Sequence, residues 1–137
     1  MQAAGTETAG VIWGGNSPSV PTVLTTQEYN GSAWTTVNNA IIAQSGGAYG
    51  SVGSSQTSAF GVSGQSPGNG NQNYDGTTWV TAPNLGTART GLAGAGTVAA
   101  GVVFMGQPPG SPTTRVGTTE EFTAESSALN VKTLTQS

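Results

Sequence analysis

Six carboxylates are the residues best suited to acid–base chemistry in this sequence, because it contains neither histidine nor cysteine. The commonest general base, thiol nucleophiles and thiolate metal ligands are therefore all missing. Glu120 and Glu121 are adjacent, and adjacent side chains on a strand point to opposite faces, so they cannot form the facing carboxylate pair of a glycosidase. No Asp-rich loop supplies the converging oxygens that a metal ion needs. We therefore expect a non-enzymatic protein with no catalytic residue, cofactor or metal site.

Paired aromatics suggest a second chemistry, the stacking of sugar rings. "YNGSAW" at 29–34 and "YDGTTW" at 74–79 place Tyr and Trp on either side of an Asx-Gly dipeptide. The same side chains also commonly pack across a hairpin or between sheets. Recurrence at the same place in successive repeats favours packing, because a core position must repeat and a ligand site need not. Glycan binding remains the alternative.

Phosphate binding, nucleic-acid binding and membrane insertion are not expected. "GLAGAG" at 91–96 has the glycines of a phosphate loop, but neither a lysine nor a helical pattern follows it. Three basic residues and a net charge of −3 cannot neutralise a run of phosphates. The sequence shows no apolar run of membrane-spanning length and no basic-then-apolar secretory leader.

Composition predicts a folded, β-rich protein with many turns. The 137 residues include 22 glycines and 7 prolines, and only 7% are charged, against about 25% in an ordinary domain. Disordered chains lack aromatic and β-branched residues, whereas this chain has 3 Trp, 3 Tyr and 3 Phe together with many Val, Ile and Thr.

An internal repeat organises the chain. Three segments align without gaps: "TAGVIWGGNSP" at 8–18, "TSAFGVSGQSP" at 57–67 and "AAGVVFMGQPP" at 99–109. The aligned glycines, Gly15, Gly64 and Gly106, are 49 and 42 residues apart. We expect a single repeat domain, 1–137, with units of about 1–45, 46–90 and 91–137.

Each unit reads as four strands. The apolar run between glycines is typical of a strand buried on both faces. Asn-Gly and Asp-Gly between alternating runs predict hairpins with two-residue type I′ turns. The proline-containing segments 16–22, 65–70 and 107–113 are expected to be loops.

This pattern resembles kelch repeats. A kelch blade has a Trp, a Pro, an Arg before small residues and an apolar strand ending in glycine. The matching residues here are Trp79, Pro83, Arg89, Gly91, Gly94 and the strand 101–106. The first copy lacks the arginine and the last lacks the tryptophan. The resemblance implies an all-β fold of about three four-stranded β-propeller blades, with Arg89 bonding carbonyls or a carboxylate between blades.

The wording "LGTARTGLAGAGT…GVVFMG…GTTEEF" is also similar to Gly/Thr-rich kelch-like arrays of bacteriophage structural proteins, particularly those of aquatic phages. This resemblance implies a virion structural or attachment protein, on a tail fibre or other appendage, with other virion proteins and a host-surface glycan as partners. Two alternatives remain: a subunit of a non-viral extracellular filament or surface assembly, and a propeller-type carbohydrate-active enzyme.

Three blades are too few for a closed propeller, since propellers have about 4–8 blades and the resemblance to kelch repeats implies roughly six or seven. We therefore expect a homo-oligomer, either a two-fold dimer closing about six blades or a head-to-tail assembly. The stub 1–6 and the strand near 128–134 are expected to meet a partner's edges. The first unit begins within the repeat motif, so the chain could be part of a longer array.

Recognition is expected on loops, because the sequences of the repeats differ most there. In a blade, the loops between the second and third strands lie on the same face as the connections between blades. The candidate binding residues on these loops are Asn16, Ser17, Gln65, Asn69, Gln107 and Arg115.

Overall fold

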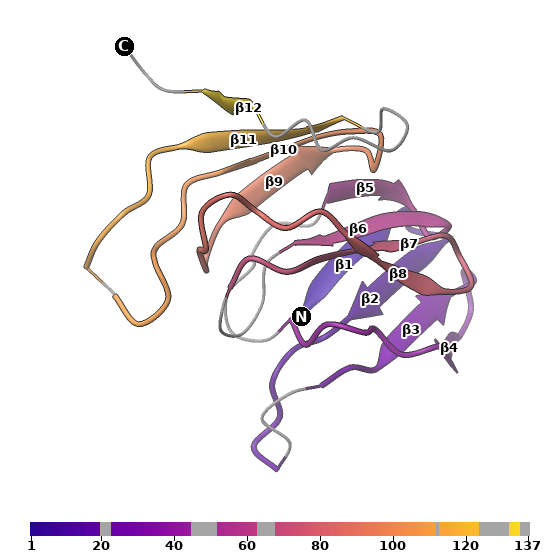
Figure 1. The fold of residues 1–137 in the computed structure, drawn as a ribbon. Coiled ribbons are helices and arrows are strands. Elements are labelled where there is room, and N and C mark those ends of the chain that lie inside the picture. The colour runs from indigo at the N-terminus through magenta and orange to yellow at the C-terminus, as the bar shows by residue number, and fades with distance from the viewer. Residues whose placement is uncertain (20–22, 45–51, 63–67, 112, 124–131, 135–137) are drawn as a thin grey trace.

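The computed structural model describes residues 1–19, 23–44, 52–62, 68–111, 113–123 and 132–134, and within these ranges it contains strands and no helix. The strands form three four-stranded antiparallel sheets, each with its strands in chain order (Figure 1). The first sheet comprises β1 (Gln2–Gly5), β2 (Gly10–Trp13), β3 (Thr26–Tyr29) and β4 (Trp34–Val37). The second comprises β5 (Val52–Ser55), β6 (Ser58–Val62), β7 (Asn71–Tyr74) and β8 (Trp79–Ala82). The third comprises β9 (Ala93–Gly96), β10 (Ala100–Phe104), β11 (Thr119–Thr123) and β12 (Lys132–Leu134). The all-β prediction is confirmed.

The three sheets lie face to face, with the second between the other two. Their first strands, β1, β5 and β9, are neighbours in space. One apolar cluster fills the first junction, between the first and second sheets, around Trp13 and Trp79. Another fills the second junction, between the second and third sheets, around Phe60 and Phe122. The core is therefore divided into two layers, one at each junction.

Strand register makes positions equivalent between sheets. Tyr29 pairs with Gly10, Tyr74 with Ala59 and Phe122 with Gly101. Because side chains alternate along a strand, each sheet has two defined faces. The aromatic face carries Gln27, Tyr29 and Trp34 in the first sheet, Gln72, Tyr74 and Trp79 in the second, and Glu120 and Phe122 in the third. The acceptor face carries Trp13, Thr26 and Glu28, then Val62, Asn71 and Asn73, then Phe104, Thr119 and Glu121.

The two hairpins predicted around the Asx-Gly dipeptides are present, but their turns differ from the prediction. Each Tyr pairs directly with its Trp, which leaves four-residue loops at 30–33 and 75–78. A type I′ turn needs left-handed backbone at both central residues. Only the glycines adopt it, Gly31 at φ 92° and Gly76 at φ 94°. The prediction of two-residue type I′ turns is therefore wrong.

The Asx side chain closes each of these loops instead. Asn30 Oδ1 accepts hydrogen bonds from the backbone amides two and three residues later, both at 3.0 Å. Asp75 Oδ1 does the same at 2.8 and 2.7 Å. Because these bonds favour the ionised carboxylate, they hold the pKa of Asp75 below its ordinary value.

Asp75→Asn is expected to keep this loop and remove its pH dependence, since Asn30 closes the equivalent loop with a neutral amide. A depressed folded-state pKa means that the stabilisation is complete above the unfolded-state pKa of about 4, and is lost as pH falls through the folded-state pKa. Thermal scans from about pH 5 to pH 2 should therefore show a steeper loss for the parent chain than for Asp75→Asn. Asp75→Ala should melt lower at every pH. Equal slopes for the parent and Asp75→Asn would contradict this assignment.

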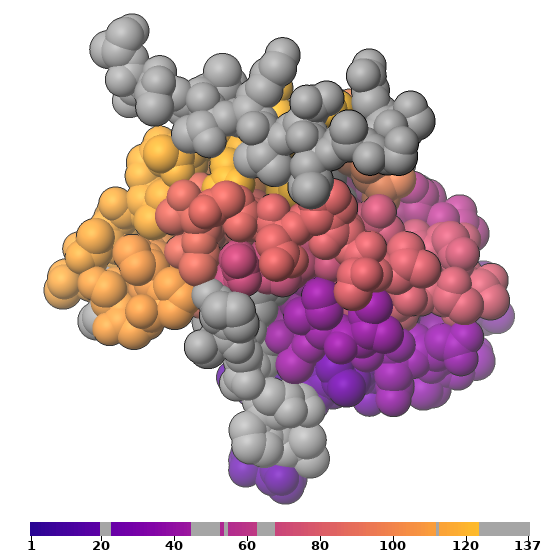
Figure 2. Space-filling model, viewed as in Figure 1, coloured from indigo at the N-terminus to yellow at the C-terminus, as the bar shows by residue number. Residues whose placement is uncertain are grey.

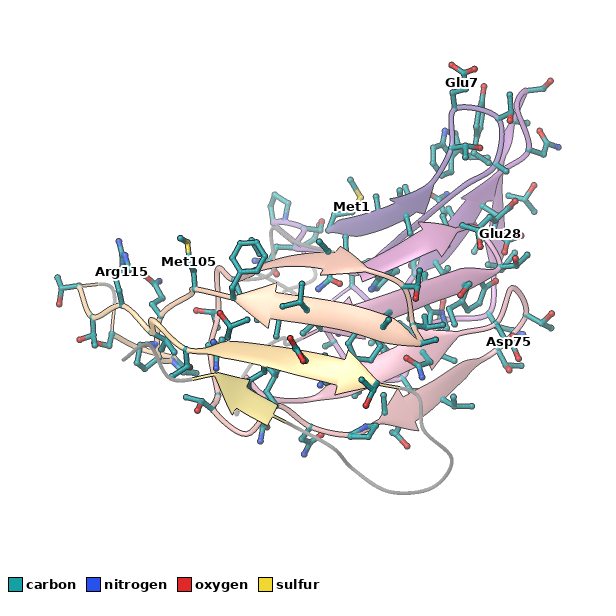
Figure 3. The ribbon with its side chains drawn as sticks, turned by 90° about the horizontal axis from the view of Figure 1, so that it is seen from above. Met1, Glu7, Glu28, Asp75, Met105 and Arg115 are labelled. Atoms are coloured by element: carbon teal, nitrogen blue, oxygen red, sulfur yellow. The ribbon has the colours of Figure 1, made fainter. Side chains whose placement is uncertain are left out.

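The long loops and the inter-sheet connections lie at one end of each sheet. In a four-stranded meander, the loop between the second and third strands opens at the end where the chain enters and leaves. We call this the loop end, formed by the described residues of 14–25, 38–44, 68–70, 83–92 and 105–118. The opposite turn end carries the Asx loops. Figure 3 shows Met105 and Arg115 on one side of the molecule, and Glu7 and Asp75 on the other.

Candidate recognition surfaces

The candidate residues of the first two repeats lie on separate loops. Asn16 is exposed and Ser17 half-buried on the loop that follows β2. Asn69 is half-buried, and its carbonyl accepts a hydrogen bond of 2.8 Å from Leu85 N in the connection to the third sheet. Gln65 lies outside the described residues.

The candidates of the third repeat are joined to each other on the β10–β11 loop. Arg115 Nη1 donates to Gln107 Oε1 at 2.8 Å. The backbone of Gln107 exchanges two hydrogen bonds with Thr90, and Val116 N closes the base of the loop on Gly106 O at 2.9 Å. The loop bulges from one side of the molecule (Figure 2, orange). It therefore presents a structured, exposed surface that includes a guanidinium group.

Met105 stands at the beginning of this loop and was missed by sequence reasoning. Among the described residues other than glycine, it alone has left-handed backbone, at φ 62°, and its side chain is 65% exposed. A long apolar residue seldom adopts this conformation. No sequence signal marks it, because nothing in "VVFMGQ" distinguishes Met105 from the apolar strand residues before it.

Arg89, by contrast, is fully buried and structural, as its resemblance to the kelch arginine implied. Its side chain, from the connection between the second and third sheets, forms an ion pair with Glu120 of the third sheet. Nε donates to Thr87 O, Nη1 to Met105 O and Thr118 O, and Nη2 to Thr118 Oγ1 and to the Glu120 carboxylate. All five guanidinium N–H groups are thus satisfied.

Besides its ion pair with Arg89, Glu120 also bonds the backbone of the connection that leads into the third sheet. Its carboxylate accepts hydrogen bonds from the backbone amides of Gly86, at 2.7 Å, and Thr87, at 3.3 Å. Glu121, the next residue, lines a hollow on the opposite face of the sheet. The two glutamates therefore point away from each other, as the strand alternation predicted.

A neutral version of this arrangement holds the first junction, and sequence reasoning missed it. Gln72, equivalent to Glu120, accepts from the backbone amides of Ile41 and Ile42 at 2.9 and 3.0 Å. Its amide nitrogen donates to Gln44 Oε1, which also accepts from the Trp13 indole at 2.7 Å. Gln72 and Glu120 occupy the same repeat position, and that shared position is the signal that could have revealed them.

The two aromatic pairs have the same geometry but different surroundings. Tyr74 and Trp79 stack at 4.8 Å and are buried in the first junction. Tyr29 and Trp34 stack at 5.1 Å on the first sheet, where Trp34 is 48% exposed. The structure thus bears out the packing interpretation for the second pair and leaves the first pair as an exposed aromatic surface.

Hydrogen bonds at the first junction fix the buried pair. The Tyr74 hydroxyl donates to Glu28 Oε1 at 2.8 Å, and the Trp79 indole donates to Thr26 Oγ1 at 2.9 Å. Burial and the neighbouring Glu28 carboxylate raise the pKa of Tyr74, so the hydroxyl stays protonated and donates. The aromatic and acceptor faces are therefore chemically complementary.

The described carboxylates with assigned partners act in structural contacts. Glu120 bonds Arg89, Glu28 bonds Tyr74 and Asp75 closes its own loop. Within the described residues, no three acidic side chains gather as metal ligands would. In the same part of the chain, no helix has the length and apolar character needed to cross a membrane.

No known protein-family model matches the chain, and no curated protein matches it significantly.

Proposed function

We propose that this chain is a kelch-like propeller segment that serves as a non-enzymatic structural and attachment component of a bacteriophage virion, on a tail fibre or other appendage. The observation that carries the structural role is the stack of three four-stranded sheets of the same topology, with a buried apolar cluster at each of the two junctions. The phage assignment is supported by the resemblance of the repeat sequence to the Gly/Thr-rich kelch-like arrays of bacteriophage structural proteins.

The chain associates with further copies of itself in this proposal, because its two outermost sheet faces are not covered by described residues of the chain. The loop end then provides the recognition surface, with host-surface glycans or other virion proteins as ligands. The structured β10–β11 loop, with exposed Met105 and Arg115, supports this placement.

Electron microscopy of the purified chain, combined with glycan-array binding, tests this function. We expect closed rings or short assemblies, and glycan binding that is lost when the β10–β11 loop is replaced by a short turn. Replacement of the β9–β10 turn at 97–99, at the opposite end of the same sheet, is the matched control and should retain binding. Binding that survives replacement of all three long loops would overturn the recognition proposal.

Two alternatives have distinct signatures. A non-viral extracellular filament or surface assembly would appear as long, regular polymers in the same micrographs. A carbohydrate-active enzyme would turn over substrates in a broad glycosidase panel, and turnover abolished by a single Glu→Gln substitution would replace the proposal.

A further inference from the structure

The first junction is defined by three contacts between an acceptor face and an aromatic face. Trp13 of the first sheet lies 5.1 Å from Trp79 of the second, centroid to centroid. Thr26 and Glu28, beside it on the acceptor face, accept the hydrogen bonds from Trp79 and Tyr74. An aromatic ring, a threonine and a glutamate therefore make up the acceptor side.

The second junction uses a different set of residues at the same positions. Its acceptor face, on the second sheet, has Val62, Asn71 and Asn73, and its aromatic face has Phe122 in place of Tyr. Phe122 has no hydroxyl to donate, and Asn73 Oδ1 is buried without a hydrogen-bond partner among the described residues. Within this chain, glutamate on the acceptor side thus goes with tyrosine opposite, and asparagine goes with phenylalanine.

Two further faces of the same two kinds are not covered by described residues. The aromatic face of the first sheet has the stacked pair Tyr29 and Trp34. Trp34 lines a hollow of about 420 Å³, together with residues of β1 and β2. The acceptor face of the third sheet has Phe104, Thr119 and Glu121, all half-buried. Glu121 lines a hollow of about 410 Å³ there, together with its strand neighbour Val102.

These two faces repeat the chemistry of the first junction. The third sheet again offers an aromatic ring, a threonine and a glutamate, at positions that the register makes equivalent to those of the first sheet. The first sheet offers Tyr29 and Trp34. These are equivalent in register to Tyr74 and Trp79, the donors at the first junction. Neither face repeats the Asn and Phe pattern of the second junction.

We propose that the acceptor face of the third sheet packs on the aromatic face of the first sheet of a second copy of this chain. In this contact, Glu121 accepts a hydrogen bond from the Tyr29 hydroxyl of the second copy, and Thr119 accepts one from its Trp34 indole. The inference rests on the proposed self-association and names its residues. It places the contact on sheet faces, in addition to the strand edges expected from the sequence.

The contact is heterologous, because two different faces meet. Such contacts close into rings where the rotation allows it and otherwise continue as filaments. Two copies joined twice in this way form a two-fold ring of six sheets (2 × 3). The dimeric and the head-to-tail assemblies predicted from the sequence therefore use the same interface.

Sedimentation velocity of the full chain over a range of concentrations tests the paired residues. Glu121→Gln and Tyr29→Phe should each weaken self-association at least roughly tenfold, the loss expected for a hydrogen bond to a charged group. The double variant should be little weaker than either single variant. Glu7→Gln, which removes a carboxylate at the turn end, is the control and should associate like the parent chain.

Mixing two blocked variants tests the direction of the contact. Val102 pairs with Glu121 and so lies on the acceptor face of the third sheet. Trp34→Glu blocks the aromatic face of the first sheet and Val102→Lys blocks this acceptor face, while melting curves confirm that each variant folds. Each variant alone should remain monomeric, and an equal mixture should form a one-to-one dimer through the two intact faces. A parent chain that stays monomeric would overturn both the self-association and this interface. A parent chain that associates while these variants associate equally well, or fail to complement each other, would overturn the interface alone.

Discussion

Arg89→Met is expected to lower the free energy of unfolding by about 3–5 kcal/mol, the loss typical when one partner of a buried ion pair is removed. The Glu120 carboxylate would remain fully buried with only two backbone amides to bond it. Three carbonyl groups, those of Thr87, Met105 and Thr118, would lose their donor. Urea unfolding at low protein concentration measures the change on the isolated chain.

A double replacement distinguishes the cost of a buried charge from the loss of packing. Arg89→Gln with Glu120→Gln turns the charged second junction into the Gln–Gln arrangement that the first junction already uses. The double variant should be more stable than either single variant, with a coupling free energy of about 1 kcal/mol or more. Additive losses would show that the ion pair contributes only through the volume of its side chains.

Trp79→Ala is expected to cost about 3–5 kcal/mol, as large-to-small replacements of buried aromatics do. Trp79 is 6% exposed, stacks on Tyr74 and contacts Trp13 across the first junction. The matched change, Trp34→Ala, removes the same residue type from the equivalent position of the first sheet. Because Trp34 is 48% exposed, its loss should cost only about 1 kcal/mol in the dilute monomer. Equal losses would mean that the first sheet's aromatic face is also covered in the isolated chain.

The number of strands in each repeat and their antiparallel pairing followed from the sequence because local signals agreed. Apolar runs between glycines, alternating runs and Asx-Gly dipeptides all pointed to four antiparallel strands, and the structure has them. The turn type did not follow, because "NG" fits both a two-residue turn and a longer loop closed by the Asx side chain. That distinction depends on where the next strand begins, and Trp34 pairs directly with Tyr29.

The polar contacts at the junctions were only partly predictable. Alternation showed that Glu120 and Glu121 face opposite ways, but not which of them lies inside. The resemblance to kelch repeats implied a carboxylate or carbonyl partner for Arg89. It could not identify Glu120, because that residue is 31 positions away and is brought close only by the tertiary fold. Gln72 reads as a solvent-facing strand residue, yet it is fully buried because it accepts two backbone amides from the connection at 41–42.

The burial of the apolar strands in a single chain differs in part from the burial that their sequences predict. β6 is buried on both faces, as its composition predicted, because sheets cover it on both sides. β2 and β10 are similarly apolar, but Ile12 and Val102 are only half-buried on the outer faces of their sheets. Contact with a second copy would give these strands the two-sided burial that their composition predicts.

The gathering of the long loops at one end of the sheets has a consequence for binding strength. In a ring of two copies, the loops of both chains would face the same side, held at fixed spacing by the stacked sheets. Linked sites raise one another's effective concentration, so that avidity can exceed single-site affinity by about 10²–10⁴ without any new contact. The ring would then bind a surface of repeated glycans tightly, although each loop alone binds it weakly. It would dissociate once only one loop remains bound.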